Sequence, residues 1–215
     1  MIARQLHSSS PIVHVVEDDR AAREATARFL RAAGYQVRIY ATATEFLETA
    51  PINVPGCVVL DLQLPGLSGL DLQRALAYRE DPPPVVFLSG RSGVQQSVEA
   101  MKLGAIDFLT KTADGLELLA AVSRAIARDA EGREERGRLR LLRDRHARLS
   151  PREREVLAHL ISGQLNKQVG FDLGISEQTT KIHRHRILEK MQAHSIADLV
   201  RMASDLGIMP IGAVR

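Results

Sequence analysis

Side chains suited to phosphoryl chemistry follow four short apolar runs in the first half of the chain. Glu17-Asp18-Asp19 follows the run ending at Val16, Asp61 follows Leu60, Ser89 follows Leu88, and Lys111 closely follows Leu109. Carboxylates that share one site repel each other, and a divalent cation with hard oxygen ligands relieves that repulsion, which suits Mg²⁺. With Mg²⁺ and Lys111 neutralising phosphoryl oxygens and Ser89 donating to one of them, Asp61 is a candidate covalent phosphoryl acceptor.

A parallel sheet would bring these residues together. The apolar runs predict strands at Ile12 to Val16, Gln36 to Tyr40, Cys57 to Leu60, Val85 to Leu88 and Ala105 to Leu109. Amphipathic stretches between them predict helices at Ala21 to Ala33, Ala43 to Thr49, Gly69 to Ala77, Val94 to Lys102 and Gly115 to Arg128. Since the carboxyl ends of parallel strands share one edge, the reactive residues should meet there.

Taken singly, an Asp at a strand end more often caps a helix or makes a turn. The complete set, in this order and spacing, closely resembles the receiver domain of two-component response regulators over residues 11–128. Two longer segments also resemble the receiver sequence. They are Asp61-Leu62-Gln63-Leu64-Pro65-Gly66-Leu67-Ser68-Gly69 and Ala100-Met101-Lys102-Leu103-Gly104-Ala105-Ile106-Asp107-Phe108-Leu109.

That resemblance implies an α/β flavodoxin-like fold with a parallel five-stranded sheet in the order 2-1-3-4-5. By position, it makes Asp61 the phospho-acceptor, assisted by Lys111 and Ser89, and makes Ser89 and Phe108 the switch pair. The Mg²⁺ ligands would be Asp18, Asp19, Asp61 and the Gln63 backbone carbonyl. Thr112 follows Lys111 where the family usually has a cis proline, so altered geometry is expected in this loop, and the sequence leaves open whether this peptide is cis or trans.

The second half of the chain is predicted to be helical and basic. Residues 1–128 hold 13 Lys and Arg against 14 Asp and Glu, whereas residues 129–215 hold 16 against 12. The charge-dense stretch 129–148 is predicted to be a partly helical linker, with a short coiled dimer contact as the alternative to a solvated surface. Helices are then expected at Pro151 to Ser162, Asn166 to Leu173, Glu177 to Met191 and Ser195 to Leu206.

The helix from Glu177 to Met191 carries basic side chains on most faces, and Ile175, Ile182, Leu188 and Met191 are expected to form its apolar stripe. Charge alone fits a solvated surface helix equally well. The order of residues distinguishes the two interpretations, because residues 149–207 resemble the LuxR-type four-helix domain, in which a helix-turn-helix binds DNA. Receiver and LuxR-type domain together resemble the NarL/FixJ family, with domains at 11–128 and 149–215.

This second resemblance implies the DNA contacts. By position, Lys181, Ile182 and His185 would face base edges, and Asn166, Lys167, Thr179 and Arg184 would contact phosphates. Gly170 and Thr180 stand where the family usually has Ala and Val, which suggests looser packing between the two reading helices. His183 and His185 are two residues apart, so they point in different directions on a helix and a zinc site is rejected.

Composition and the lengths of the apolar runs limit the possible protein classes. The single cysteine, Cys57, excludes an internal disulfide and lies in an apolar run, so it is expected in the core. The sequence shows no signal peptide and no apolar run of bilayer length, so a cytoplasmic protein without membrane association is expected.

Three other functions share features with this sequence. A haloacid-dehalogenase-like phosphatase needs a second Asp two residues after the nucleophile, where this chain has Gln63. In a flavodoxin-like FMN protein the first loop must bind a phosphate, which Glu17-Asp18-Asp19 would repel. A phosphorylation-independent transcription factor with a vestigial receiver stays open. The favoured interpretation is a regulator and not an enzyme. A sensor histidine kinase is expected to phosphorylate it, and the phosphorylated protein is expected to be a homodimer that binds double-stranded DNA and acts on RNA polymerase.

Overall fold

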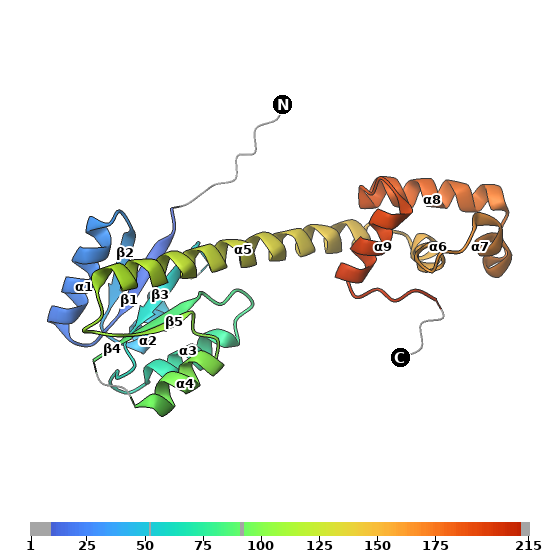
Figure 1. Cartoon of the computed structure of the whole chain (residues 1–215). Helices are drawn as coiled ribbons and strands as arrows, with labels where there is room; N and C mark the ends of the chain where they lie inside the picture. The colour runs from blue at the N-terminus through green and yellow to red at the C-terminus, as the bar shows by residue number, and fades with distance from the viewer. Residues whose placement is uncertain (1–9, 52, 91–92, 212–215) are drawn as a thin grey trace. The chain divides into compact units, whose positions relative to one another are not determined.

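The computed structural model describes residues 10–51, 53–90 and 93–211. The chain divides into two compact units, Met1–Arg133 and Glu134–Arg215, and each is described by itself (Figure 1). In the described residues, no helix is both long enough and apolar enough to cross a membrane.

The N-terminal unit is a parallel sheet covered by helices on both faces (Figure 1). Its strands are β1 (Ile12–Val16), β2 (Gln36–Tyr40), β3 (Gly56–Leu60), β4 (Val85–Ser89) and β5 (Asp107–Thr110). Its helices are α1 (Arg20–Ala32), α2 (Ala43–Thr49), α3 (Gly69–Ala77), α4 (Val94–Lys102) and α5 (Gly115–Ala147). The strand order β2-β1-β3-β4-β5 confirms the predicted topology.

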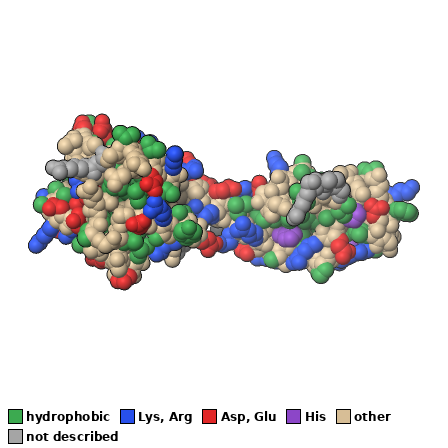
Figure 2. Space-filling view, turned by 90° about the horizontal axis from the view of Figure 1, so that it is seen from below, with side chains coloured by type: hydrophobic (Ala, Val, Ile, Leu, Met, Phe, Trp, Pro, Cys, Tyr) green, Lys and Arg blue, Asp and Glu red, His purple; other side chains and the backbone are tan. Residues whose placement is uncertain are grey.

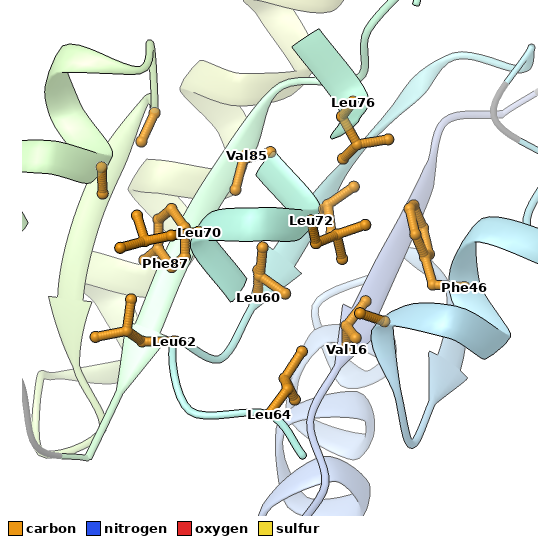
Figure 3. Packing of buried hydrophobic residues seen from close by; sticks show 14 of the residues in the cluster. Val16, Phe46, Leu60, Leu62, Leu64, Leu70, Leu72, Leu76, Val85 and Phe87 are labelled. Carbon is orange, nitrogen blue, oxygen red and sulfur yellow. The ribbon is translucent and has the colours of Figure 1, made fainter. Parts of the chain in front are cut away.

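Alternating residues of the strands fill two separate cores. On one face, Val16, Leu60 and Phe87 pack with apolar residues of α2, α3 and α4 (Figure 3). On the other face, Val13, Val59 and Val86 pack with apolar residues of α1 and α5, and the buried Cys57 belongs to this core. Both faces of the central strands are therefore buried, as expected for a parallel sheet.

The predicted start of β5 was wrong by two residues. Ala105 and Ile106 lie outside the strand, because the Ala105 N–H donates to the Ala100 carbonyl and so closes the end of α4. Gly104 has a φ of 89°, which allows this reversal of the chain. The strand begins at Asp107 and ends at Thr110, directly before Lys111.

Helix α5 extends beyond the predicted end at Arg128, through most of the predicted linker, to Ala147. Asp129, which is 3% exposed, accepts hydrogen bonds from the Gly56 N–H at 2.9 Å and from Arg133 Nε at 2.8 Å. Arg133 also donates to the Val54 carbonyl at 2.8 Å. These contacts hold the helix against the start of β3, at the edge of the sheet opposite the reactive residues.

The C-terminal unit contains the end of α5 and the predicted four helices. They are α6 (Pro151–Ile161), α7 (Asn166–Leu173), α8 (Glu177–Met191) and α9 (Ile196–Asp205), around one apolar core. Ser150 starts α6 with a capping box, in which its hydroxyl accepts from the Glu153 N–H and the Glu153 carboxylate accepts from the Ser150 N–H. Gly174 ends α7 in the left-handed region at φ 65°, which sets the turn into α8.

Candidate functional site

Three carboxylates meet at the carboxyl ends of β1 and β3. Glu17 and Asp18 follow β1, Asp61 follows β3, and one carboxylate oxygen of each lies within 4.8 Å of those of the other two. The strand register explains this meeting, because Val16 pairs with Leu60 and the next residue of each strand is therefore Glu17 or Asp61. Glu17 and Asp61 are 5% and 6% exposed, whereas Asp18 is exposed.

Lys111 joins two of these carboxylates. Its Nζ lies 2.6 Å from Glu17 Oε2 and 2.7 Å from Asp61 Oδ2. Burial raises the pKa of Glu17, and the hydrogen bond from Lys111 offsets only part of that rise. Burial alone would lower the pKa of Lys111, but the hydrogen bonds to Asp61 and Glu17 outweigh it, so its pKa is raised. The lysine therefore stays cationic beside the acidic pair.

The backbone fixes the position of Asp61. Its N–H donates to the Val16 carbonyl at 2.9 Å, and its Oδ1 accepts from the Gln63 N–H at 3.2 Å. Gly69, the first residue of α3, comes so close that a Cβ added there would lie 2.3 Å from the Asp61 carbonyl oxygen. Only glycine permits this approach, so the start of α3 holds the loop that carries Asp61.

Asp19, which the sequence interpretation places among the metal ligands, lies at the N-cap of α1. Its Oδ1 accepts from the Ala22 N–H at 2.7 Å, which is the ordinary role of an Asp before a helix. The Asp19 N–H donates to Glu17 Oε1 at 3.2 Å, so Asp19 also helps to orient the Glu17 side chain. Among the described residues, the carboxylates whose oxygens lie within 4.8 Å of one another are those of Glu17, Asp18 and Asp61.

The predicted switch residues lie on neighbouring strands. Ser89 is the last residue of β4, is fully buried, and pairs in register with Thr110 of β5. Phe108 of β5 is half-buried and stacks on Phe87, with ring centroids 5.6 Å apart and planes 22° apart. The described residues contain no cis peptide bond, so the Lys111–Thr112 peptide is trans.

The carboxylate cluster suits a small hard cation. It offers three oxygen donors from three residues within a few ångströms of one another, two of them nearly buried and the third open to solvent. Mg²⁺ is usually held by a few carboxylates and keeps several waters, so an open acidic site of this kind fits it.

The predicted DNA-contacting residues lie on α7 and α8. Asn166 and Lys167 are the first two residues of α7, while the other five lie within the first nine residues of α8. Lys181 is exposed and pairs with Glu177 at 2.9 Å, a contact of two solvated groups that is worth little and is easily exchanged for a phosphate or base. Thr179 is half-buried, and its hydroxyl lies 2.8 Å from that of Ser176.

Ile182 lies outside the core of the C-terminal unit, whereas the predicted apolar stripe of α8 placed it inside. Its side chain is 45% exposed, whereas Ile187, fully buried, fills the core together with Met191. Ile187 lies four residues before Met191, a spacing that places both on the same helix face, while Ile182 points elsewhere. Exposure of Ile182 leaves it available on the outer face with Lys181 and His185, which are also exposed.

Sequence models of two domain families match the chain. The response regulator receiver domain matches residues 13–123, and the bacterial regulatory proteins of the luxR family match residues 147–203. The chain is 42% identical to Nodulation protein W of Bradyrhizobium diazoefficiens over 201 residues, which are 94% of this chain and 88% of that protein. It is also 42% identical to the transcriptional regulatory protein FixJ of Azorhizobium caulinodans over 199 residues, which are 92% and 94% of the two proteins.

Solved structures give the same picture. The response regulator StyR aligns with a TM-score of 0.82 at 39% identity, over 91% of this chain and 99% of that one. Full-length FixJ from B. japonicum aligns with a TM-score of 0.56 at 35% identity, over 94% and 100% of the two chains. The chain therefore belongs to the NarL/FixJ family of transcriptional response regulators, with a receiver domain followed by a LuxR-type DNA-binding domain. These two domains imply a histidine kinase as phosphoryl donor and DNA as target.

Proposed function

We propose that Asp61 is the residue that a sensor histidine kinase phosphorylates, and that the phosphoryl group controls DNA binding by the LuxR-type domain. The observation that carries this proposal is the environment of Asp61. Its side chain lies at the carboxyl edge of the sheet with one oxygen on Lys111 Nζ and the other on the Gln63 N–H, beside two further carboxylates. We assign the receiver to residues 11–128, the linker to 129–148 and the DNA-binding domain to 149–215.

In the transfer step, a carboxylate oxygen of Asp61 attacks the phosphorus of a phosphohistidine. A P–O bond forms, the P–N bond breaks, and its electron pair returns to the imidazole, which takes up a proton. The Lys111 ammonium, now paired with Asp61, is placed to compensate the phosphoryl charge, and the Ser89 hydroxyl at the end of β4 is placed to donate to a phosphoryl oxygen.

Asp18, Asp61 and the Gln63 backbone carbonyl would hold Mg²⁺, and the cluster geometry favours Glu17 over Asp19 as the remaining carboxylate. When bound, Mg²⁺ neutralises negative charge on the transferring phosphoryl oxygens. The Lys111 ammonium offsets the repulsion between Glu17 and Asp61. Asp19 supports this arrangement through the backbone hydrogen bond from its N–H to Glu17.

The signal would pass from Asp61 to the surface through Ser89 and Phe108, and the phosphorylated protein would form a homodimer through the face made by α4, β5 and α5. Exposed apolar side chains on α4 support a protein contact there: Val94 is 81% exposed, Val98 46% and Met101 45%. Two DNA-binding domains in one dimer would fit a two-fold symmetric site.

On DNA, Lys181, Ile182 and His185 would face base edges, and the phosphate contacts would come from Asn166, Lys167, Thr179 and Arg184. The outward position of the first three on α8 supports this arrangement. RNA polymerase would be the partner that reads the bound regulator. Binding should weaken steeply with salt, because each neutralised phosphate releases counterions.

The proposal is tested by the intact mass of the protein after incubation with Mg²⁺ and acetyl phosphate. We expect one phosphoryl adduct that is labile to base and absent from Asp61→Asn, while Asp71→Asn, which changes an exposed carboxylate on α3, keeps it. An adduct of equal yield in Asp61→Asn would refute the assignment. No adduct in wild type with acetyl phosphate or with any of a panel of kinases would favour the vestigial receiver.

A further inference from the structure

A groove in the C-terminal unit lies where three elements meet. The end of α5 contributes Arg145, α8 contributes His185 and Glu189, and the turn between α8 and α9 contributes Gln192 and His194. None of these residues except His185 belongs to the predicted DNA-contacting set. Figure 2 shows a face of this unit on which histidine side chains lie among Lys and Arg side chains.

The groove continues the DNA-facing side of α8. Lys181, His185, Glu189 and Gln192 follow each other at spacings of three or four residues, so they lie along one side of the helix. From His185 to Gln192 the chain advances seven residues, about 10 Å along the axis at 1.5 Å per residue. The major groove of B-DNA is about 12 Å wide. A helix that places His185 at the base edges therefore brings the protein groove near the DNA backbone beside the major groove.

Arg145 supplies a permanent positive charge at this position. Its Nη1 lies 3.4 Å from the carbonyl oxygen of Met191, the last residue of α8, a long contact that places the guanidinium at the negative end of the helix. This contact engages one of the five N–H donors of the guanidinium, and the others can reach a phosphate. Glu189 is the one acidic side chain of the lining, and it is exposed.

We propose that Arg145 and His194 bind a DNA backbone phosphate next to the major groove that α8 enters. The proposal rests on the DNA-binding mode proposed above and adds a contact from the last turn of α5, outside the helix-turn-helix. A DNA phosphate is favoured over a free anion, because His185 both lines the groove and shares the outer face of α8 with Lys181 and Ile182.

The test begins with a probe for the full chain. A duplex is selected from a random library with phosphorylated wild-type protein, and its affinity is measured between 50 and 200 mM salt, next to a scrambled duplex. We expect Arg145→Ala to bind both duplexes more weakly by the same factor, with the salt slope reduced by about 0.9. Over this range the wild type should then lose about threefold more affinity than the variant.

Arg143→Ala is the matched control, because Arg143 is an exposed arginine on the same helix, two residues away. It should leave the affinity and the salt slope unchanged. A second measurement replaces single phosphates by neutral methylphosphonates. One position should weaken the wild type and have no further effect on Arg145→Ala, a coupling that a merely structural role of Arg145 would not produce.

The outcomes separate the two proposals. If the wild type selects and binds no duplex, the DNA-binding mode itself fails. If the wild type binds and Lys181→Ala weakens sequence preference, but Arg145→Ala keeps the wild-type salt slope, the phosphate contact is wrong and the DNA-binding mode stands. A changed ratio between selected and scrambled duplex in Arg145→Ala would also contradict the proposal, because it would indicate a displaced α8.

Discussion

His14 makes the stability of the N-terminal unit depend on pH. This histidine in the middle of β1 is 2% exposed, and its Nδ1 lies 3.0 Å from the Tyr40 hydroxyl. Its ring also packs edge-on against Phe46, with centroids 5.5 Å apart. Burial, with a smaller contribution from the positive charge of Arg38, lowers the pKa of His14 from 6.5 to about 4. We therefore predict that this unit loses stability as the pH falls below about 6.5.

The sign follows from the protons that each state binds. In the unfolded chain the imidazole is protonated below its ordinary pKa of 6.5, whereas in the folded protein it stays neutral down to about pH 4. Between these values the unfolded state holds more protons, so stability rises with pH. At 1.36 kcal/mol per pH unit, the contribution is about 3 kcal/mol above pH 6.5, and about 1 kcal/mol of it is lost at pH 5.5.

Tyrosine fluorescence can follow this unit in the intact protein. The chain has no Trp, and its three tyrosines are Tyr35, Tyr40 and Tyr78, all in the N-terminal unit. Urea unfolding at several pH values, with an NMR titration of the His14 Cε1 proton, gives both the stability and the pKa. His14→Leu should be less stable at pH 7, since the Tyr40 hydroxyl loses its hydrogen bond to His14, worth about 1 kcal/mol, while that with Arg38 stays.

The variant is also the control for all other titrating groups. The unfolding free energy of the wild type minus that of His14→Leu should fall steadily from pH 6.5 towards pH 4 and change sign, because only the wild type carries the histidine contribution. Two results would refute the reasoning. One is a His14 midpoint near its ordinary value, and the other is a difference between the two proteins that does not change with pH.

Two further predictions concern the acidic site and the DNA-reading helices. Glu17→Gln should weaken Mg²⁺ binding, measured by calorimetry, about 10-fold or more. Asp19→Asn should leave Mg²⁺ binding nearly unchanged, since Asn also caps a helix. Equal losses of affinity in the two variants would return Asp19 to the ligand set. Gly170→Ala should destabilise the C-terminal unit by about 1 kcal/mol, because overpacking outweighs the gain in helix propensity. Gly137→Ala, with no atom near the added Cβ, should instead stabilise α5, and slower amide exchange in α8 of Gly170→Ala would contradict the reasoning.

Most of the fold follows from patterns that are local in the sequence. Apolar runs of strand length and amphipathic stretches of helix length predict β1, β2 and most helices at the bounds that the structure shows. The end of α5 was not predictable in this way, because a charge-dense stretch is compatible with a solvated linker or with a helix. Past Arg128 the helix is held by contacts with residues far away in the sequence, from Asp129 and Arg133 to Gly56 and Val54.

The candidate site was predicted in outline, but the sequence does not distinguish which of three neighbouring carboxylates lie closest to Asp61. Glu17, Asp18 and Asp19 are consecutive carboxylates, so residue type alone does not show which of them lie at the site. The distinction lies in the end of β1. Since the strand ends at Val16, Glu17 is the first residue past the edge and lies beside Asp61, whereas Asp19 already belongs to the start of α1. Predicting the strand end and the helix cap together would have placed Glu17 beside Asp61.

The contact between α7 and α8 shows why packing is harder to predict than secondary structure. Small residues at Gly170 and Thr180 suggested loose packing, but a Cβ at Gly170 would lie 2.8 Å from the Ile175 carbonyl oxygen and 3.3 Å from Thr180 Oγ1. Thr180 is fully buried, and its hydroxyl donates to the Ser176 carbonyl at 3.2 Å. The small residue thus lets the backbones approach instead of leaving a gap. Since that approach sets the position of α8, residue size at position 170 would act on the proposed DNA contacts through the position of this helix.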